Sequence, residues 1–220
     1  MLFLIGSPIG NLGDITLRAL DVLKEVAIIA AEDTRRSSIL LKRFQINKPL
    51  ISFHEHNEAR RTSELIERLG VGEKVALLTD AGMPSISDPG YRLVRACIES
   101  GIRIEVLPGP SAVLTALVGS GLPTDRFYFG GFLPVKSGQR ERELLAALAR
   151  GFTSIYFESP HRIVRSLEVL RRADPARLIC VARELTKQFE EYRRGDAESV
   201  LAHYEAHPPK GEITLVISGT

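Results

Sequence analysis

Apolar runs of four to six residues recur along the first half of the chain, and stretches of helical periodicity separate them. The apolar runs, which predict buried strands, cover residues 2–5, 26–31, 50–53, 75–78 and 103–107. Apolar positions three or four residues apart predict helices within residues 15–26, 36–44, 58–69, 91–98 and 111–118. This β-α alternation predicts a parallel sheet covered by helices on both faces.

The pattern changes at Gly119-Ser120-Gly121-Leu122-Pro123, where glycine and proline interrupt the apolar periodicity. The second half has more strands per helix: strands are predicted at 127–132, 154–157, 178–183, 189–194 and 212–218, and helices at 140–150, 162–171 and 197–206. We therefore predict a two-domain α/β protein. Residues 1–119 form a mostly parallel N-terminal domain, and residues 120–220 form a C-terminal domain with a mixed sheet.

The longest strand-to-helix connection runs from Leu78 to Gly90 and is rich in Gly, Pro, Ser and Asp. A plain β-α connection needs only about 2–6 residues, and longer ones are more often functional. Ligands of open α/β sheets bind at the carboxyl ends of the strands, where this loop begins. Its prolines and glycines leave backbone N–H and C=O groups free for a ligand.

The connection after the first strand, residues 6–14, has the position of a phosphate-binding loop but not its chemistry. It matches neither glycine-rich nucleotide pattern and contains no Lys or Arg. A ligand held by backbone groups and less anionic than a pyrophosphate fits better, and a plain turn is the alternative. A further turn, after the fifth strand, places Ser111 before a helix, as a possible cap.

Two more strand ends carry titratable side chains. Glu32 and Asp33 follow the second strand; Asp33 is a candidate for either chemistry or capping of the next helix. His54 and His56 follow the third strand, where imidazole could transfer a proton near neutral pH. A third metal ligand at a recognisable spacing is lacking, so we expect no metal site.

The second half has polar strand ends of its own and a basic loop. Residues 156–162 and 182–187 each place a carboxylate beside an arginine. The loop and helix start at 132–142 contain Lys136, Arg140 and Arg142, which could contact phosphates. Interleaved glutamates make a solvated helix face the alternative reading of these charges.

Composition adds few constraints. The net charge of +2 neither requires nor excludes a nucleic-acid partner. Cys97 and Cys180 lie in separate apolar runs, which indicates buried thiols in a reducing cytoplasm. The apolar start of the chain lacks a basic segment and ends at Gly6, so we expect no signal peptide and no membrane association.

Several motifs together resemble a known family. They are the 78–90 loop, Ser7-Pro8-Ile9-Gly10-Asn11-Leu12-Gly13-Asp14-Ile15-Thr16, Ala31-Glu32-Asp33-Thr34-Arg35, His54-Glu55-His56-Asn57, Leu107-Pro108-Gly109-Pro110-Ser111-Ala112, Gly131-Phe132-Leu133-Pro134, Glu158-Ser159-Pro160-His161-Arg162 and Lys210-Gly211-Glu212. In order and spacing the chain is similar to the ribosomal RNA small subunit methyltransferase I family of the tetrapyrrole methylase superfamily.

The resemblance implies a homodimeric enzyme that binds S-adenosylmethionine between its two domains. It would methylate the 2′-hydroxyl of a cytidine in the decoding region of 16S rRNA, within the 30S subunit. The cofactor contacts that it implies are Pro8, Asp80, Gly82, Met83, Ser85, Ile86, Ser111, Ala112, Phe157, Glu158, Glu184 and Leu185. Our candidates for the base and its orienting groups are Glu32, Asp33, His54 and His56. Our candidates for RNA contacts are Arg35, Arg36, Lys136, Arg140, Arg142 and Arg162.

Two other functions stay open at this point. One is methylation of a tetrapyrrole-like small molecule with the same cofactor; the basic 136–142 loop and the His54–Asn57 segment favour RNA instead. The other is a ribosome-binding module without catalysis. Its support is that family members commonly continue some tens of residues beyond the last predicted strand.

Overall fold

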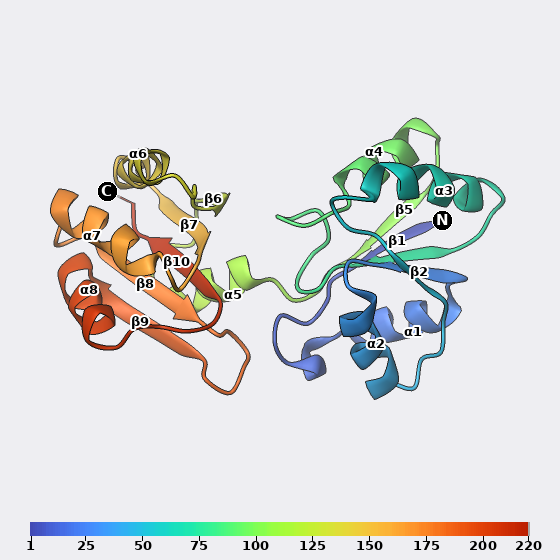
Figure 1. Cartoon of the computed structure of the whole chain (residues 1–220), viewed down its shortest axis with the longest axis horizontal. Coiled ribbons are helices and arrows are strands. Elements are labelled where there is room, and N and C mark those ends of the chain that lie inside the picture. The colour runs from blue at the N-terminus through green and yellow to red at the C-terminus, as the bar shows by residue number, and fades with distance from the viewer. Residues whose placement is uncertain (220) are drawn as a thin grey trace. The chain divides into compact units, whose positions relative to one another are not determined.

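The computed structural model describes residues 1–219 and divides the chain into two compact units, Met1–Ser111 and Ala112–Thr220 (Figure 1). The division falls at the start of helix α5 (Ala112–Ser120), eight residues before the predicted boundary at 119. α5 packs on strands β7, β8, β9 and β10 of the second unit. A nearly continuous apolar helix needs a sheet to cover it, and the glycines that follow it do not mark the boundary.

The first unit is a five-stranded parallel sheet in the order β3-β2-β4-β1-β5. Its strands are β1 (Leu2–Ile5), β2 (Ile28–Ala31), β3 (Leu50–Ser52), β4 (Val75–Leu78) and β5 (Ile104–Leu107). Its helices are a 3-10 turn η1 (Leu12–Asp14), α1 (Leu17–Glu25), α2 (Thr34–Arg43), α3 (Glu58–Gly70) and α4 (Tyr91–Glu99). The predicted parallel sheet is confirmed.

Alternate residues of the strands feed two separate cores. On β1, Phe3 and Ile5 pack in a cluster that includes Leu23 of α1. Leu2 and Leu4 point the other way, into a cluster that includes Leu65 of α3. Figure 1 shows α1 and α2 on one face of the sheet and α3 and α4 on the other. Since the strands are parallel, the loops that follow them all emerge at one edge.

The second unit has a mixed sheet, as predicted, and its five strands are in the order β6-β7-β10-β8-β9. Only the β6–β7 pair is parallel. The strands are β6 (Phe127–Phe132), β7 (Thr153–Glu158), β8 (Leu178–Arg183), β9 (Glu191–Asp196) and β10 (Ile213–Ile217). Besides α5, the helices are α6 (Ser137–Leu148), α7 (Ile163–Ala173) and α8 (Ala197–Ala206), and α6 to α8 share one core with the sheet. No helix within residues 1–219 is long and apolar enough to cross a membrane.

Candidate active site at the carboxyl edge of the first sheet

Three of the strand-end loops of the first unit are packed tightly together. Ser7 and Gly82 exchange backbone hydrogen bonds, with N···O distances of 2.8 and 3.0 Å. A Cβ atom on Gly6 would lie 2.8 Å from the sulfur of Met83 and 2.9 Å from the Cα of Gly109. A side chain at Gly6 or Gly109 would collide with the neighbouring loop. The loops after β1, β4 and β5 therefore form one fixed surface.

The loop from Thr79 to Gly90 holds an unusual backbone conformation. Ser85 and Ser87 have φ angles of 72° and 63°, in the left-handed region that costs non-glycine residues energy. The Ser85 N–H donates to the Pro89 carbonyl at 3.3 Å and closes the turn. Strain of this kind gathers at functional sites.

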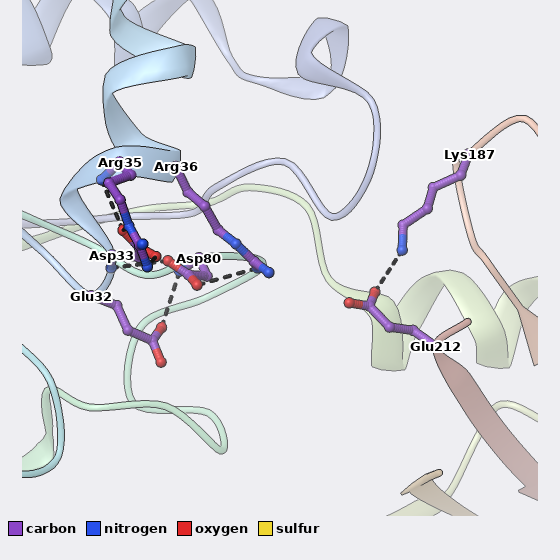
Figure 2. Close-up of polar contacts among 7 residues, drawn as sticks. All are labelled: Glu32, Asp33, Arg35, Arg36, Asp80, Lys187 and Glu212. Carbon is purple, nitrogen blue, oxygen red and sulfur yellow. Dashed lines mark hydrogen bonds and ion pairs between the residues drawn. The ribbon is translucent and has the colours of Figure 1, made fainter. Parts of the chain in front are cut away.

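Carboxylates from neighbouring strands meet at this edge, as Figure 2 shows. The backbone N–H of Asp80 donates to Glu32 Oε2 at 3.1 Å, and that of Asp33 donates to Asp80 Oδ1 at 3.1 Å. Arg36 Nη1 lies 3.2 Å from Asp80 Oδ2. The adjacency of β2 and β4 explains the meeting, because both strands end here.

Asp33 is committed to the start of α2. Its carboxylate accepts a hydrogen bond from the backbone N–H of Arg35 at 2.8 Å. It also accepts hydrogen bonds from Nε and Nη2 of that guanidinium, at 3.1 and 2.8 Å. These bonds to Arg35 lower the pKa of Asp33 to about 2. Helix capping therefore describes Asp33 better than the basic role that the sequence analysis also allowed, since so weak a base accepts a proton poorly at neutral pH.

Asp88 is the residue that the sequence analysis missed. Partial burial, and then the negative charges of Glu32 and Asp80, raise the pKa of its carboxyl to about 7. Among the described residues, no side chain or backbone group forms a hydrogen bond or ion pair with it. The signal was available: the loop contains a second aspartate besides Asp80. We call Glu32, Asp80 and Asp88 the carboxylate cluster.

His54 is held as part of a turn. Asn57 Oδ1 accepts the backbone N–H of His54 at 2.9 Å, which fixes the amide so that Nδ2 faces the imidazole Nε2 at 3.0 Å. Nε2 then accepts this bond and the neutral ring carries its proton on Nδ1, a buried atom with no partner among the described residues. In this state His54 has no lone pair free to act as a base.

His56 is exposed, and its ring lies 6.0 Å from that of His54 in a T-shaped contact. Among residues 1–219, no group of three or more His, Cys, Asp and Glu side chains is arranged to hold a metal ion. Of the four base candidates, Glu32 and His56 are the two with an accepting atom that the protein itself does not occupy.

In the second unit, the predicted cofactor contact Glu158 serves the protein's own structure. Its side chain is fully buried and accepts Arg162 Nε at 2.8 Å, Ser166 Oγ at 2.8 Å and the Ser159 N–H at 2.7 Å. Phe157 beside it is half-buried and packs against the rings of Phe129 and Phe132. Arg162, a predicted RNA contact, is thereby occupied by an ion pair.

Glu184 is occupied in the same way. It accepts Lys187 Nζ at 2.8 Å and the Glu212 N–H at 2.9 Å, and both contacts lower its pKa. Lys187 also reaches Glu212 Oε2 at 2.9 Å, the pair drawn in Figure 2. Leu185 is buried. The sequence placed these residues at a strand end but did not indicate that they satisfy one another.

The predicted RNA contacts differ in accessibility. The side chains of Arg35 and Arg36 are 89% and 67% exposed at the carboxyl edge of the first sheet. Lys136 and Arg142 are exposed in the second unit. Arg140 is only 5% exposed and donates to the carbonyls of Pro134 and Val135, so its predicted phosphate contact is corrected to an internal clamp on the loop before α6.

The remaining predicted cofactor contacts lie on the fixed loop surface or beside it. Pro8 is buried in the first loop, Met83 and Ser85 are half-buried, and Ile86 is exposed. Ser111 ends the first unit and Ala112 begins the second. The hydroxyls of Ser7 and Thr79, residues almost wholly buried at this edge, have no hydrogen-bond partner among the described residues.

This fold is that of a class of methyltransferases. The family model for Tetrapyrrole (Corrin/Porphyrin) Methylases matches residues 1–201. A solved diphthine synthase aligns with a TM-score of 0.74 and 15% identity, over 99% of this chain and 89% of that one. A uroporphyrin-III-C-methyltransferase from Thermus thermophilus aligns with a TM-score of 0.68 and 22% identity, over 99% and 93%.

Curated relatives define the family more narrowly. A ribosomal RNA small subunit methyltransferase I of Thermotoga maritima is 46% identical over 99% of this chain and 98% of its own length. Proteins of the same name from Mesorhizobium japonicum and Escherichia coli O157:H7 are 50% and 46% identical, over 98% and 99% of this chain and 74% and 77% of their own length. The chain therefore belongs to the tetrapyrrole methylases and, within them, to the ribosomal RNA small subunit methyltransferase I family, as the motifs indicated.

Proposed function

We propose that this protein methylates the 2′-hydroxyl of a cytidine in the decoding region of 16S rRNA, with S-adenosylmethionine as the methyl donor and the 30S subunit as the substrate. The observation that carries the proposal is the near-full-length similarity to rRNA methyltransferases of that name. The carboxylate cluster beside exposed arginines supports it, since the site offers proton acceptors next to phosphate-binding groups. The homodimer remains a prediction of the resemblance, and the cytoplasmic location remains a prediction from the two cysteines.

The residues of the fixed loop surface fit the cofactor. S-adenosylmethionine supplies an electrophilic methyl group, and its sulfonium and ammonium groups are cationic. The loops after β1 and β4 have no Lys or Arg to repel those charges, and Glu32, Asp80 and Asp88 attract them.

Proton removal falls to the carboxylate cluster in this proposal. A ribose hydroxyl is a poor nucleophile, so its proton must move to a base as the oxygen attacks. Oε1 of Glu32 is not used in any hydrogen bond within the described residues, and Asp88 has both oxygens free. A base whose pKa lies near the working pH is the most effective one, which favours Asp88, whose pKa the nearby charge of Glu32 helps to raise.

Orientation of the RNA falls to exposed cations. Arg35 and Arg36 extend from the first turn of α2, directly beside the carboxylate cluster. Guanidinium groups bind phosphate oxygens in a forked geometry, which positions a backbone without reading its bases. In the second unit, Lys136 and Arg142 are exposed and keep their predicted role.

The test uses 30S subunits from a strain that lacks the modification. They are incubated with the protein and labelled S-adenosylmethionine, and the label is mapped by nuclease resistance of the 2′-O-methylated position. We expect one labelled cytidine in the decoding region. Label at another position would reject the specificity, label on uroporphyrinogen in place of RNA would support the tetrapyrrole alternative, and tight cofactor binding without any transfer would favour the non-catalytic module.

A further inference from the structure

Glu58 is a buried carboxylate that the proposed reaction does not use. It is the first residue of α3 and is 8% exposed. Its Oε1 accepts two backbone N–H groups from another segment, those of Gly90 at 3.0 Å and Arg92 at 3.2 Å. The Arg92 guanidinium lies 3.9 Å from its Oε2 and is largely exposed. Burying a carboxylate is costly unless such partners compensate for lost water.

The two N–H groups belong to the start of α4, which has no cap of its own. Gly90 occupies the N-cap position with φ of 137°. A Cβ there would lie 2.6 Å from Ser85 Oγ and 3.0 Å from Leu77 Cδ2, so no capping side chain can be accommodated. Glu58 supplies the missing acceptor from a different helix, and its negative charge is also favourable at the positive end of the α4 dipole.

At its other end Glu58 is anchored in the His54 turn. Its backbone N–H and that of Asn57 both donate to the His54 carbonyl at 2.9 Å. Asn57 in turn bonds the backbone of Ser52 and both the backbone and ring of His54. One carboxylate therefore connects a hydrogen-bonded turn after β3 to the end of the long loop after β4.

We infer that Glu58 is a positioning residue: through Gly90 and Arg92 it fixes the end of the Thr79–Gly90 loop and so holds Asp88 against Glu32 and Asp80. Only Pro89 lies between Asp88 and Gly90, and its ring restricts φ. The Ser85–Pro89 hydrogen bond closes the turn from the other side. The catalytic consequence rests on the proposed function, whereas the contact itself does not.

The experiment compares three variants of the full chain. Glu58→Ala removes both acceptors, Glu58→Gln keeps Oε1 as an acceptor, and Glu64→Ala removes another α3 glutamate, which pairs only with Arg61 within its own helix. Hydrogen exchange is measured at the Gly90 and Arg92 amides, the Asp88 carboxyl is titrated by NMR, and methyl transfer to 30S subunits is followed against pH.

Glu58→Ala should speed exchange at both amides by about tenfold, the effect of losing a helix cap. The Asp88 pKa should fall from about 7 toward its ordinary value, and the acid limb of the methyl-transfer profile should move with it. Glu58→Gln and Glu64→Ala should stay within about twofold of wild type in exchange.

Unchanged exchange rates at the Gly90 and Arg92 amides, together with an unchanged Asp88 titration, in Glu58→Ala would overturn the inference. If Glu58→Ala does not fold, Glu58→Gln still decides, because exchange as fast as in a frayed helix end would show that the acceptor atom does not hold the loop. If wild type transfers no methyl group, the proposed function fails, while exchange and titration still test the contact.

Discussion

Two carboxylates of the first unit, Glu32 and Asp88, differ from two of the second, Glu158 and Glu184, in what occupies their oxygens. In the first unit, Glu32 accepts one backbone N–H, and Asp88 has no partner among the described residues. In the second unit, Glu158 is enclosed by Arg162, Ser166 and a backbone N–H, and Glu184 by Lys187 and the Glu212 N–H.

This difference separates carboxylates that remain available to a ligand from carboxylates that the protein itself occupies. A carboxylate saturated by its own chain stabilises a helix start or a strand end and has little capacity left for a ligand. Glu32 and Asp88 keep that capacity, and the charge of Glu32 contributes to the raised pKa of Asp88. Polar residues at a strand end are therefore weak indicators of function until their partners are counted.

The largest expected effect is on turnover. Glu32→Gln keeps the size of the side chain and an acceptor for the Asp80 N–H, but it removes the basic carboxylate. We expect single-turnover methyl transfer to fall by about 10²–10⁴-fold, the usual contribution of a general base. The measurement is rapid-quench transfer to 30S subunits at saturating cofactor, and a rate within about threefold of wild type would remove Glu32 from the mechanism.

The matching substitution in the second unit should act on stability. Glu158→Ala leaves the buried Ser166 hydroxyl and the half-buried Arg162 guanidinium without their acceptor. Loss of one partner of a buried pair costs about 3–5 kcal/mol, so denaturant unfolding should shift to much lower midpoints. Glu141→Ala, which breaks an exposed pair with Arg172, is the control and should cost about 1 kcal/mol or less. Equal costs for the two variants would mean that Glu158 is not structural.

An exposed and a buried arginine should also differ: one should affect RNA binding and the other stability. Arg35→Gln removes an exposed cation at the first edge and should weaken binding to 30S subunits about threefold to tenfold, with a smaller salt dependence. Arg140→Gln removes a buried clamp and should lower stability without a change in affinity per folded molecule. Binding titrations at two salt concentrations measure the affinity for 30S subunits, with Arg171→Gln as an exposed control from α7. An affinity loss in Arg140→Gln alone would reverse the assignment.

The smallest effect is a pH-dependent one. Because the folded-state pKa of Asp88 is raised from 3.8 to about 7, wild type loses stability as pH rises from about 4 to about 7. Asp88→Asn cannot ionise. Its stability relative to wild type should therefore increase across this pH range and stay constant above about pH 7. Partial solvation limits the gain to about 1–2 kcal/mol, read as thermal midpoints at pH 5 and 8. A difference between the proteins that stays constant with pH would show that Asp88 titrates normally.

The sequence was sufficient for the fold and for the edge at which the site lies. Apolar periodicity predicted both sheets, and the carboxyl-end rule placed Glu32, Asp80 and His54 on one side of the first. The sequence did not predict the hydrogen-bond partners. Asn57 occupies the Nε2 atom of His54 through a turn geometry that residue spacing does not encode. The burial of Arg140 and the pKa of Asp88 likewise depend on residues distant in the chain.

The most direct test of the account is the pH profile of single-turnover methyl transfer to 30S subunits, from pH 6 to 8.5, in wild type and Asp88→Asn. We predict that the wild-type rate rises with the loss of one proton from Asp88 at an apparent pKa of about 7 and then levels off. The Asp88→Asn profile should be flat over the same range. A flat wild-type profile, or the same limb in Asp88→Asn, would contradict the claim that the carboxylate cluster accepts the proton.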